Sequence, residues 1–395
     1  MEGEDWIMGK EGFKEEYRLR VELFQKRLKE KELEGALIFQ PADLFYLAGT
    51  SPEGHLFVPP EGEPRLLVYG EVERAQEEAV WNPVVPISSF KEIPLSLADW
   101  GFKGLKRLGT EMDIISLKLF SRYQALFPDC QWEDISPDLR TLRMVKSASE
   151  LEAIRYSASQ HAKVFQYIRE HIRPGMTELE IAVEVETYAR RLGHQGRVRF
   201  RGQEQGLPIG VVAAGPNGAC GIGVPWTIGG RGLSGLYPMG ASTRRWETGE
   251  PLLVDYAGVY GDYLVDQTRV YFAGQVDRIL ERAQAVAYEI ACSLAEAARP
   301  GTTAGELYAL AVKQARQAGL ADYFMGWDRK AGFVGHGVGL ELNEWPVLAP
   351  GQETVLEPGM VLAIEPKFVF PGQGAVGVED TYLVTQEGAK PLTQG

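Results

Sequence analysis

An internal repeat constrains the fold of the second half of this chain more than any other feature. Residues 173–193, RPGMTELEIAVEVETYARRLG, align without gaps onto residues 299–319, RPGTTAGELYALAVKQARQAG, with eight of 21 positions identical. In each copy, Arg-Pro-Gly is expected to end one helix, and the threonine two residues later is expected to cap the next. Convergence of similar turns is the alternative, but the shared Glu, Ala and Arg lie beyond the turn. The repeat therefore favours a duplicated α/β half, with a site where the halves meet.

The length of 395 residues suggests two domains rather than one. In the first part, the apolar segments GALIF, LFYLAG, HLFV and RLLVYG alternate with turn residues and helical stretches, a texture typical of an α/β layer. The alternation of short apolar segments ends at LRMVKSASELEAIR, where Ser147 or Ser149 is expected to cap a long helix. We place the boundary near Val145, between an N-terminal α/β domain at 13–144 and a second domain at 146–395.

Charge and composition exclude several classes of function. The net charge of −13 and the pI near 5.1 argue against a general nucleic-acid binder and against a binder of anionic membranes. No stretch approaches 18 consecutive apolar residues, and the N-terminus lacks the pattern of a signal peptide, so we expect no membrane span and a cytoplasmic location. The three cysteines form no CxxC pair, so they predict neither a disulfide framework nor a thiolate zinc site.

Two aspartates lie in the segment GEPLLVDYAGVYGDYLVDQTRVYFAG, which predicts two strands around a tight turn. With Tyr260-Gly261 as a two-residue turn, Asp255 pairs directly with Asp266 on one face of the hairpin. Opposed side chains lie about 4.5–5.5 Å apart at Cβ. Either one carboxylate then holds a proton or a cation lies between the two. A pair that faces solvent is the alternative.

Three later residues strengthen the interpretation as a metal site. FVGHGVGLELNEW places His336 in a glycine-rich stretch, LEPGMVLAIEP places Glu365 at the end of an apolar strand, and GAVGVEDTYLV places Glu379 in another. Acidic residues inside apolar strands are seldom buried unless they are paired or bind metal. His336 taken alone could be a structural residue, but it is the histidine that lies among these strands.

The charges of these groups predict two divalent metal ions. Four carboxylates carry about −4, which two divalent ions would neutralise while the histidine binds as a neutral ligand. A mainly oxygen ligand set with one imidazole suits Mn(II) and tolerates Co(II), Zn(II) or Fe(II). Two ions about 3.5–4 Å apart can share a water and lower its pKa towards neutrality. Competing signatures are absent from the sequence, namely the GxSxG elbow, the HExxH helix and the phosphate-binding GxxxxGK[ST] loop.

The order of the motifs resembles the pita-bread metallopeptidase family of creatinase, prolidase and aminopeptidase P type. LFYLAGT and LRMVKSASELEAIR resemble the creatinase-type N-terminal domain and its junction. VAAGPNGA, VDYAGVYGDYLVDQTR, GHGVGLELNEWP, LEPGMVLAIEP and VEDTYLV resemble the catalytic domain, so the resemblance covers nearly the whole chain. It implies an α/β (α+β) chain in which a creatinase-type domain precedes a pita-bread domain with a pseudo-two-fold repeat. It also implies a homodimer.

The resemblance assigns roles to individual residues. Asp266 and Glu379 would bridge two ions, and Glu365 would also move a proton to or from the bridging water. Thr268 would orient one of the ligands. The complete set of ligands that the family's pattern implies is Asp255, Asp266, His336, Glu365 and Glu379.

The chain departs from the family's pattern around this centre. Ile222 and Asn343 stand where prolidase and aminopeptidase P carry histidines, and Gly377 stands where they often carry an arginine. Asn343 is the candidate catalytic replacement, since its amide can donate a hydrogen bond, although it cannot shuttle a proton near neutral pH. Peptide hydrolysis is therefore expected to be slow unless other groups compensate.

Substrate-binding candidates lie in the altered regions. Ile222 occupies the position of one missing histidine. Arg199 or Arg245 could bind a substrate carboxylate in a bidentate manner, through two guanidinium N–H groups. Trp345 could line the pocket. Solvated loop charges are the alternative for the arginines, and core or dimer packing is the alternative for the tryptophan.

Three functions follow from these observations. The first is a metal-dependent hydrolase in which a metal-bridged hydroxide attacks the amide carbonyl of an Xaa-Pro dipeptide or short peptide. The second keeps the fold and the metal centre but acts on a non-peptide small molecule, as a C–N hydrolase or a lyase. The third is a catalytically inactive binding module.

Overall fold

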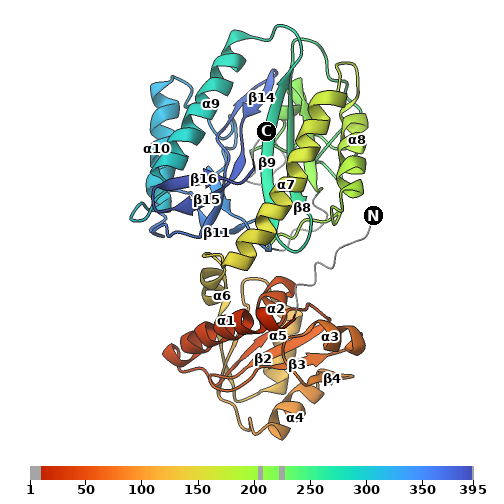
Figure 1. The fold of residues 1–395 in the computed structure, drawn as a ribbon, viewed down its shortest axis with the longest axis vertical. Helices are drawn as coiled ribbons and strands as arrows, with labels where there is room; N and C mark the ends of the chain where they lie inside the picture. Colours follow the sequence, from red (N-terminus) through yellow and green to blue (C-terminus); the bar gives the residue numbers. More distant parts are fainter. Residues whose placement is uncertain (1–9, 203–207, 222–226, 394–395) are drawn as a thin grey trace. The chain divides into compact units, whose positions relative to one another are not determined.

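The computed structural model describes residues 10–202, 208–221 and 227–393. It divides into two compact units, Met1–Leu142 and Arg143–Gly395 (Figure 1). The boundary predicted near Val145 lies just beyond this division. The prediction of a mixed α/β chain is confirmed, since both units combine helices with sheets.

The first unit is built on a six-stranded mixed sheet with the strand order β4-β3-β2-β1-β5-β6. The β1–β2 and β2–β3 pairs are antiparallel, whereas the other three pairs are parallel. Buried apolar residues from the strands and from α4 and α5 form the core. The elements are α1 (Lys10–Glu30), β1 (Ala36–Ile38), α2 (Pro41–Ala48), β2 (Gly54–Val58), β3 (Arg65–Val68), α3 (Val72–Glu78), β4 (Val84–Pro86), α4 (Glu92–Asp99), β5 (Arg107–Thr110), α5 (Leu117–Leu126), β6 (Gln131–Asp134) and α6 (Ser136–Leu142).

The apolar segment LFYLAG forms helix α2, unlike the strand segments GALIF, HLFV and RLLVYG with which the sequence grouped it. Its boundaries have local causes. The Gln40 side chain accepts a hydrogen bond from the Asp43 backbone N–H at 2.8 Å, and Pro41 occupies the first turn. Gly49 ends the helix in the left-handed conformation at φ 76°. These end signals, rather than periodicity, decide the secondary structure of the segment.

The second unit carries the repeat in its helices and a set of antiparallel sheets between them. The sheets have the orders β7-β8-β9, β11-β10-β12-β15-β16 and β13-β14. The elements are α7 (Ala148–His171), α8 (Glu178–Arg191), β7 (Gly210–Ala214), the 3-10 helix η1 (Gly215–Ala219), β8 (Pro251–Val259), β9 (Leu264–Phe272), α9 (Arg278–Ala297), α10 (Ala304–Gln317), β10 (Gly335–Gly337), β11 (Glu344–Val347), β12 (Val361–Ile364), β13 (Lys367–Phe370), β14 (Gly374–Gly377), β15 (Asp380–Thr385) and β16 (Gly388–Pro391).

The two helix pairs of this unit enclose the strands from opposite sides (Figure 1). Buried residues of α7 and α8 share one core with β7 and β8. Buried residues of α9 and α10 share a second core with β12 to β15. A bridge between Thr268 of β9 and Glu379 joins the two sets of strands. The strands between the helix pairs are therefore the place where the two halves meet.

The repeated sequence forms the same structure twice, as predicted. In one copy, α7 ends before Arg-Pro-Gly and Thr177 caps α8; in the other, α9 ends before Arg-Pro-Gly and Thr303 caps α10. Each threonine forms a capping box with the glutamate three residues later. The predicted cap of α7 is also present, with Ser147 rather than Ser149 as the capping residue.

Removing the Thr303 cap of α10 should destabilise the second unit. Thr303 Oγ1 accepts from the Glu306 backbone N–H at 3.2 Å, and Glu306 Oε2 accepts from the Thr303 N–H at 2.7 Å. Thr303→Ala is therefore expected to lower the free energy of unfolding by about 1 kcal/mol, whereas Thr303→Ser keeps the acceptor and should lower it far less. Equilibrium urea unfolding measures both values. Equal values for the two variants would show that the cap contributes nothing.

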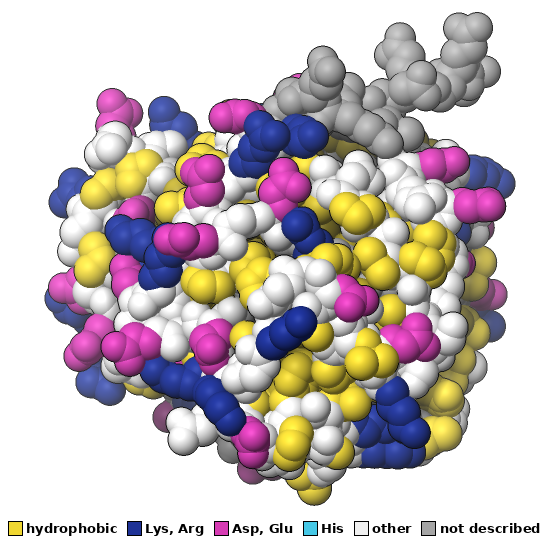
Figure 2. Space-filling view, turned by 90° about the horizontal axis from the view of Figure 1, so that it is seen from below, with side chains coloured by type: hydrophobic (Ala, Val, Ile, Leu, Met, Phe, Trp, Pro, Cys, Tyr) yellow, Lys and Arg dark blue, Asp and Glu magenta, His cyan; other side chains and the backbone are white. Residues whose placement is uncertain are grey.

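On the face seen in Figure 2, basic and acidic side chains are interspersed among apolar ones, and neither sign forms a continuous patch. Among the helices that the structure describes, none combines the length and the apolar character needed to cross a membrane.

Candidate metal centre

The hairpin that carries the two aspartates has a different register from the one predicted. Asp255 pairs with Thr268, and Asp266 pairs with Ala257, so the aspartates are diagonal neighbours rather than directly opposed. Four residues, 260–263, connect β8 to β9 instead of a two-residue turn. Because the shift is an even number of residues, both aspartates still point to the same face.

Tertiary contacts explain the longer loop. The Tyr263 hydroxyl donates to Glu150 Oε1 at 2.7 Å, and the Tyr263 carbonyl accepts from Ser157 Oγ at 2.7 Å. Both partners belong to α7, and the Tyr260 and Tyr263 side chains are buried. Helix α7 thus holds the loop open, a constraint that lies outside the hairpin's own sequence.

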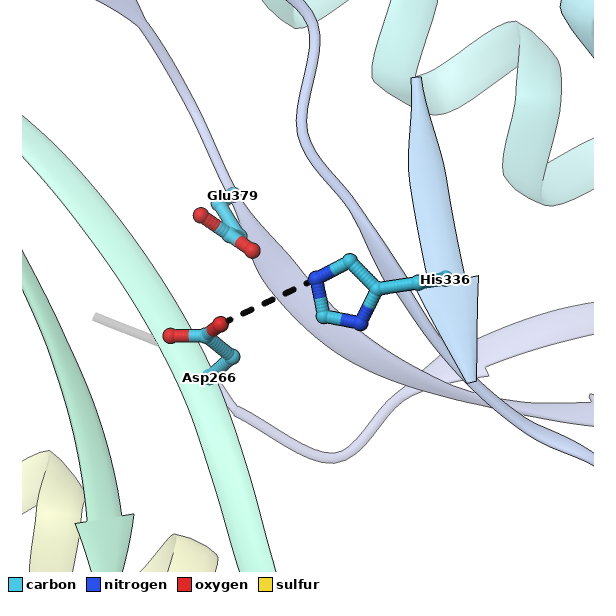
Figure 3. Close-up of side chains that lie close together, drawn as sticks. All are labelled: Asp266, His336 and Glu379. Atoms are coloured by element: carbon cyan, nitrogen blue, oxygen red, sulfur yellow. Dashed lines mark ion pairs between the residues drawn. The ribbon is translucent and has the colours of Figure 1, made fainter. Parts of the chain in front are cut away.

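Three of the predicted ligands converge from three separate segments (Figure 3). Asp266 of β9, His336 of β10 and Glu379 each offer one ligand atom, and these atoms lie within 4.8 Å of one another. His336 Nε2 lies 4.0 Å from Asp266 Oδ2 and 3.5 Å from Glu365 Oε1. The Asp266, Glu365 and Glu379 residues are buried, at 6%, 6% and 1% exposure.

Burial and mutual repulsion disfavour ionisation of the two aspartates. Burial raises the pKa of Asp266 well above its ordinary value, and the charges of Glu379 and Asp255 raise it further. Burial also raises the pKa of Asp255, although the nearby Lys367 charge acts in the opposite direction. A divalent cation among these oxygens would reverse the effect by favouring the charged forms.

The donor atoms of this cluster fit one divalent ion. When His336 Nδ1–H donates to the Gly337 carbonyl at 3.1 Å, Nε2 directs its lone pair towards Asp266 and Glu365. Glu379 Oε1 is buried and has no hydrogen-bond partner among the described residues. A buried acceptor without a partner is costly, and a metal ion would satisfy it.

Thr268 contacts a candidate ligand directly. Its hydroxyl donates to Glu379 Oε2 at 2.7 Å, and the two backbones form a bridge. Arg269, which the sequence did not single out, holds this bridge because Nη1 donates to the carbonyls of Thr268 and Glu379 at 2.9 and 2.8 Å. Arg269 Nη2 also pairs with Asp380. Together these contacts orient the Glu379 carboxylate.

Sequence reasoning also missed Lys367, which lies inside the cluster. Its ammonium donates to Glu365 Oε2 at 2.6 Å and to Glu379 Oε2 at 2.7 Å, and it lies 3.4 Å from Asp255 Oδ2. The side chain is only 2% exposed. The sequence could have pointed to it. A lysine in the apolar run AIEPKFVF is expected to be buried, and a buried lysine needs an acidic partner. The charge count that predicted two ions omitted this cation.

Asn343 is engaged by the backbone of another segment. Its Oδ1 accepts from the Arg201 N–H at 2.7 Å, and its Nδ2 donates to the Arg201 carbonyl at 2.9 Å. The Arg201 side chain is buried near Glu341, with Nη1 3.6 Å from Oε2. In this structure the Asn343 amide therefore holds Arg201 in position, and its predicted catalytic role stays a prediction.

Three of the four candidate substrate residues lie among the residues that the structure describes. Arg199 and Arg245 are exposed, and Arg245 donates to the Gly175 carbonyl beside α8 at 2.6 Å. Trp345 is half-buried in β11, whose neighbour β10 carries His336. Ile222 lies outside the described residues. The substrate-binding roles of these four residues stay predictions.

Sequence comparisons identify relatives over almost the full length. Residues 152–386 match metallopeptidase family M24, and residues 20–145 match the creatinase/prolidase N-terminal domain. The chain is 30% identical over 377 residues to an Xaa-Pro dipeptidase of Pyrococcus furiosus, an alignment that covers 95% of this chain and 97% of the relative.

Solved structures resemble the chain in the same way. The prolidase of Pyrococcus horikoshii aligns with a TM-score of 0.81 at 26% identity, covering 95% of this chain and 98% of that one. An Xaa-Pro dipeptidase of Bacillus anthracis aligns with a TM-score of 0.82 at 26% identity, covering 96% of this chain and 98% of the other.

Proposed function

The chain belongs to metallopeptidase family M24, with a creatinase/prolidase-type domain ahead of its catalytic unit, and on that premise we propose that it hydrolyses Xaa-Pro dipeptides or short proline-containing peptides. The observation that carries the proposal is the buried convergence of Asp266, His336 and Glu379 in a centre suited to a divalent ion. When bound, such an ion supplies Lewis acidity, polarising a carbonyl and lowering the pKa of water.

The chain's own residues supply orientation and proton handling. Glu365 Oε1 faces His336, while Lys367 engages Oε2, so one carboxylate oxygen remains directed at the metal-binding side. We assign proton transfer to and from the reacting water to Glu365. Thr268 and Arg269 keep the Glu379 carboxylate in place through the contacts described above.

Manganese is the proposed ion because carboxylate oxygens outnumber the single imidazole nitrogen, although cobalt, zinc or iron suits the same ligands. The proposal requires a divalent ion and does not depend on how many are bound. A homodimer and a cytoplasmic location belong to the proposal as well, and both rest on the resemblance and the composition rather than on any contact in the structure.

A second candidate keeps the centre and changes the substrate. The observation that favours it is the engagement of Asn343 with the Arg201 backbone, which leaves its amide committed where a substrate-directed histidine is expected. On this candidate the same centre would act on a small non-peptide molecule, as a C–N hydrolase or a lyase.

Proline release from metal-loaded protein tests the first function. Purified chain is stripped with a chelator, reloaded with Mn(II), Co(II), Fe(II) or Zn(II), and assayed with Met-Pro, with a proline tripeptide and with Met-Ala as the matched non-proline substrate. We expect release of proline that requires metal and exceeds cleavage of Met-Ala. Full metal occupancy without proline release would favour the second candidate. Failure to bind any of the four metals would favour an inactive binding module.

A further inference from the structure

The cluster of carboxylates has two sides with different occupants. On one side, Oε2 atoms of Glu365 and Glu379 both accept from the Lys367 ammonium, with Asp255 Oδ2 also near it. On the other side, Glu365 Oε1 faces His336 Nε2. Glu379 Oε1 does not contact the lysine and has no hydrogen-bond partner among the described residues. Glu365 therefore divides its two oxygens between the lysine and His336, and Glu379 keeps one buried oxygen that is free to bind a metal ion.

The lysine occupies the space in which one of two ions was expected. Carboxylate oxygens that bind zinc, for example, lie about 2.0–2.2 Å from the ion. An ion bound to Asp255, Glu365 Oε2 and Glu379 Oε2 would compete with the ammonium for the same oxygens and the same space. A second ion therefore does not fit this side while Lys367 keeps its position.

The backbone beside Lys367 leaves room for this arrangement. Lys367 of β13 pairs with Gly377 of β14. A Cβ at Gly377 would lie 2.7 Å from Lys367 Cγ and 2.7 Å from the Pro366 carbonyl oxygen, closer than side chains approach such atoms. A glycine at 377 is thus matched to a lysine whose stem passes over it into the cluster.

The charges agree with a single ion. The ammonium cancels about one of the four negative charges, and one divalent ion cancels two more, so a second ion is not needed to relieve most of the repulsion. Because the ammonium is covalently attached to the chain, its charge is present whatever the concentration of free metal. The geometry of the contacts, rather than the charge count, decides which side the metal takes.

We propose that Lys367 replaces one of the two metal ions, so that the chain binds a single divalent ion on the side of Asp266, His336 and Glu379. This inference deepens the proposed function, on which it rests for the presence of a metal at the centre. It assigns Lys367 as a positioning residue, since it acts by holding Glu365 and Glu379 and by excluding an ion. Gly377 makes that position of the lysine possible.

The number of bound ions tests this inference without an activity measurement. Metal-free chain is equilibrated with excess Mn(II), and the bound metal is counted by equilibrium dialysis and mass spectrometry, while electron paramagnetic resonance distinguishes isolated from spin-coupled Mn(II). The wild-type chain is expected to bind one uncoupled Mn(II) per chain. Lys367→Ala is expected to bind two, with a coupled spectrum. Lys313→Ala, which removes an exposed lysine of α10, serves as the control and should bind one.

Two bound ions in the wild-type chain, or one in both the wild type and Lys367→Ala, would overturn the inference. Lys367→Ser removes both the charge and the long stem and serves as the second variant if the alanine variant does not fold; it too should bind two ions. The inference and the proposed function can fail separately. If the wild-type chain binds one Mn(II) but releases no proline, only the proposed peptidase function is contradicted. If it binds two Mn(II) and releases proline, only the proposed role of Lys367 is contradicted.

Discussion

Asp266→Asn is expected to abolish stable metal binding and to lower kcat/KM for an Xaa-Pro dipeptide by more than about 100-fold. Asp266 faces both His336 and Glu379, so its carboxylate belongs to the metal site whether one ion or two are bound. Loss of a group that merely orients a ligand typically costs about 10–100-fold in affinity or activity, and loss of the ligand should cost more. Metal content by mass spectrometry and steady-state kinetics measure the two effects.

The same variant should not lose stability in the absence of metal. Burial and the charges of Glu379 and Asp255 oppose ionisation of Asp266, so a neutral amide relieves repulsion in the metal-free chain. Thermal unfolding of the metal-free protein should therefore occur at or above the wild-type temperature. Asp322→Asn, an exposed aspartate of the same unit, is the control and should change neither metal content nor rate. Wild-type activity in Asp266→Asn would exclude this metal site.

Glu344→Gln is expected to produce the largest loss of stability, about 3 kcal/mol or more at neutral pH. The Glu344 side chain is 5% exposed and accepts from Arg143 Nη2 at 2.5 Å and from Lys146 Nζ at 2.9 Å. Removing one charge from a buried pair leaves the partner charges uncompensated, which typically costs about 3–5 kcal/mol. Arg143 also pairs with Glu341 at 2.9 Å, so the low end of this range applies.

The pH dependence of this effect has a definite sign. Burial alone would raise the pKa of Glu344, but the charges of Arg143 and Lys146 outweigh it and lower the pKa from its ordinary value of 4.5 to about 2. A carboxyl with a depressed pKa in the folded chain stabilises it above its ordinary pKa. That contribution is lost as the pH falls through the folded value. The difference between wild type and Glu344→Gln should therefore shrink between pH 4.5 and about 2.

Urea unfolding at a series of pH values measures this difference. Glu353→Gln, which neutralises an exposed glutamate in the same unit, is the matched control and should unfold like the wild type at each pH. A loss below about 1 kcal/mol at neutral pH would mean that the pair behaves like an exposed ion pair. A difference that persists unchanged to pH 2 would show that the glutamate's charge is not its source.

Several parts of the fold could be predicted because their causes are local. The caps of α7, α8 and α10 depend on a serine or threonine and a glutamate three residues later, a pattern visible within four residues. The repeat predicted a duplicated half for a similar reason. Each Arg-Pro-Gly turn acts on its own neighbours, so the two copies form the same structure wherever they lie in the chain.

Other parts were wrong or incomplete because their causes are distant in the sequence. The connection between β8 and β9 is longer than predicted because α7 holds Tyr263 through Glu150 and Ser157. The apolar pattern of LFYLAG was compatible with a strand, and the end signals around Gln40 and Gly49 made it a helix. Periodicity in a short apolar segment does not distinguish the two structures.

The sequence by itself determined which side chains require a cation. Asp255, Asp266, Glu365 and Glu379 lie in apolar strands, and burial of such carboxylates demands a positive partner wherever the strands lie. Only the tertiary structure decided what that partner is. The pairing of β13 with β14 sets Lys367 over Gly377 and directs its ammonium to three of the carboxylates, while His336 faces Asp266 and Glu365. Whether a buried charge is met by a lysine or by a metal depends on distances of a few ångströms between segments far apart in the chain, and the folded arrangement of the strands sets those distances.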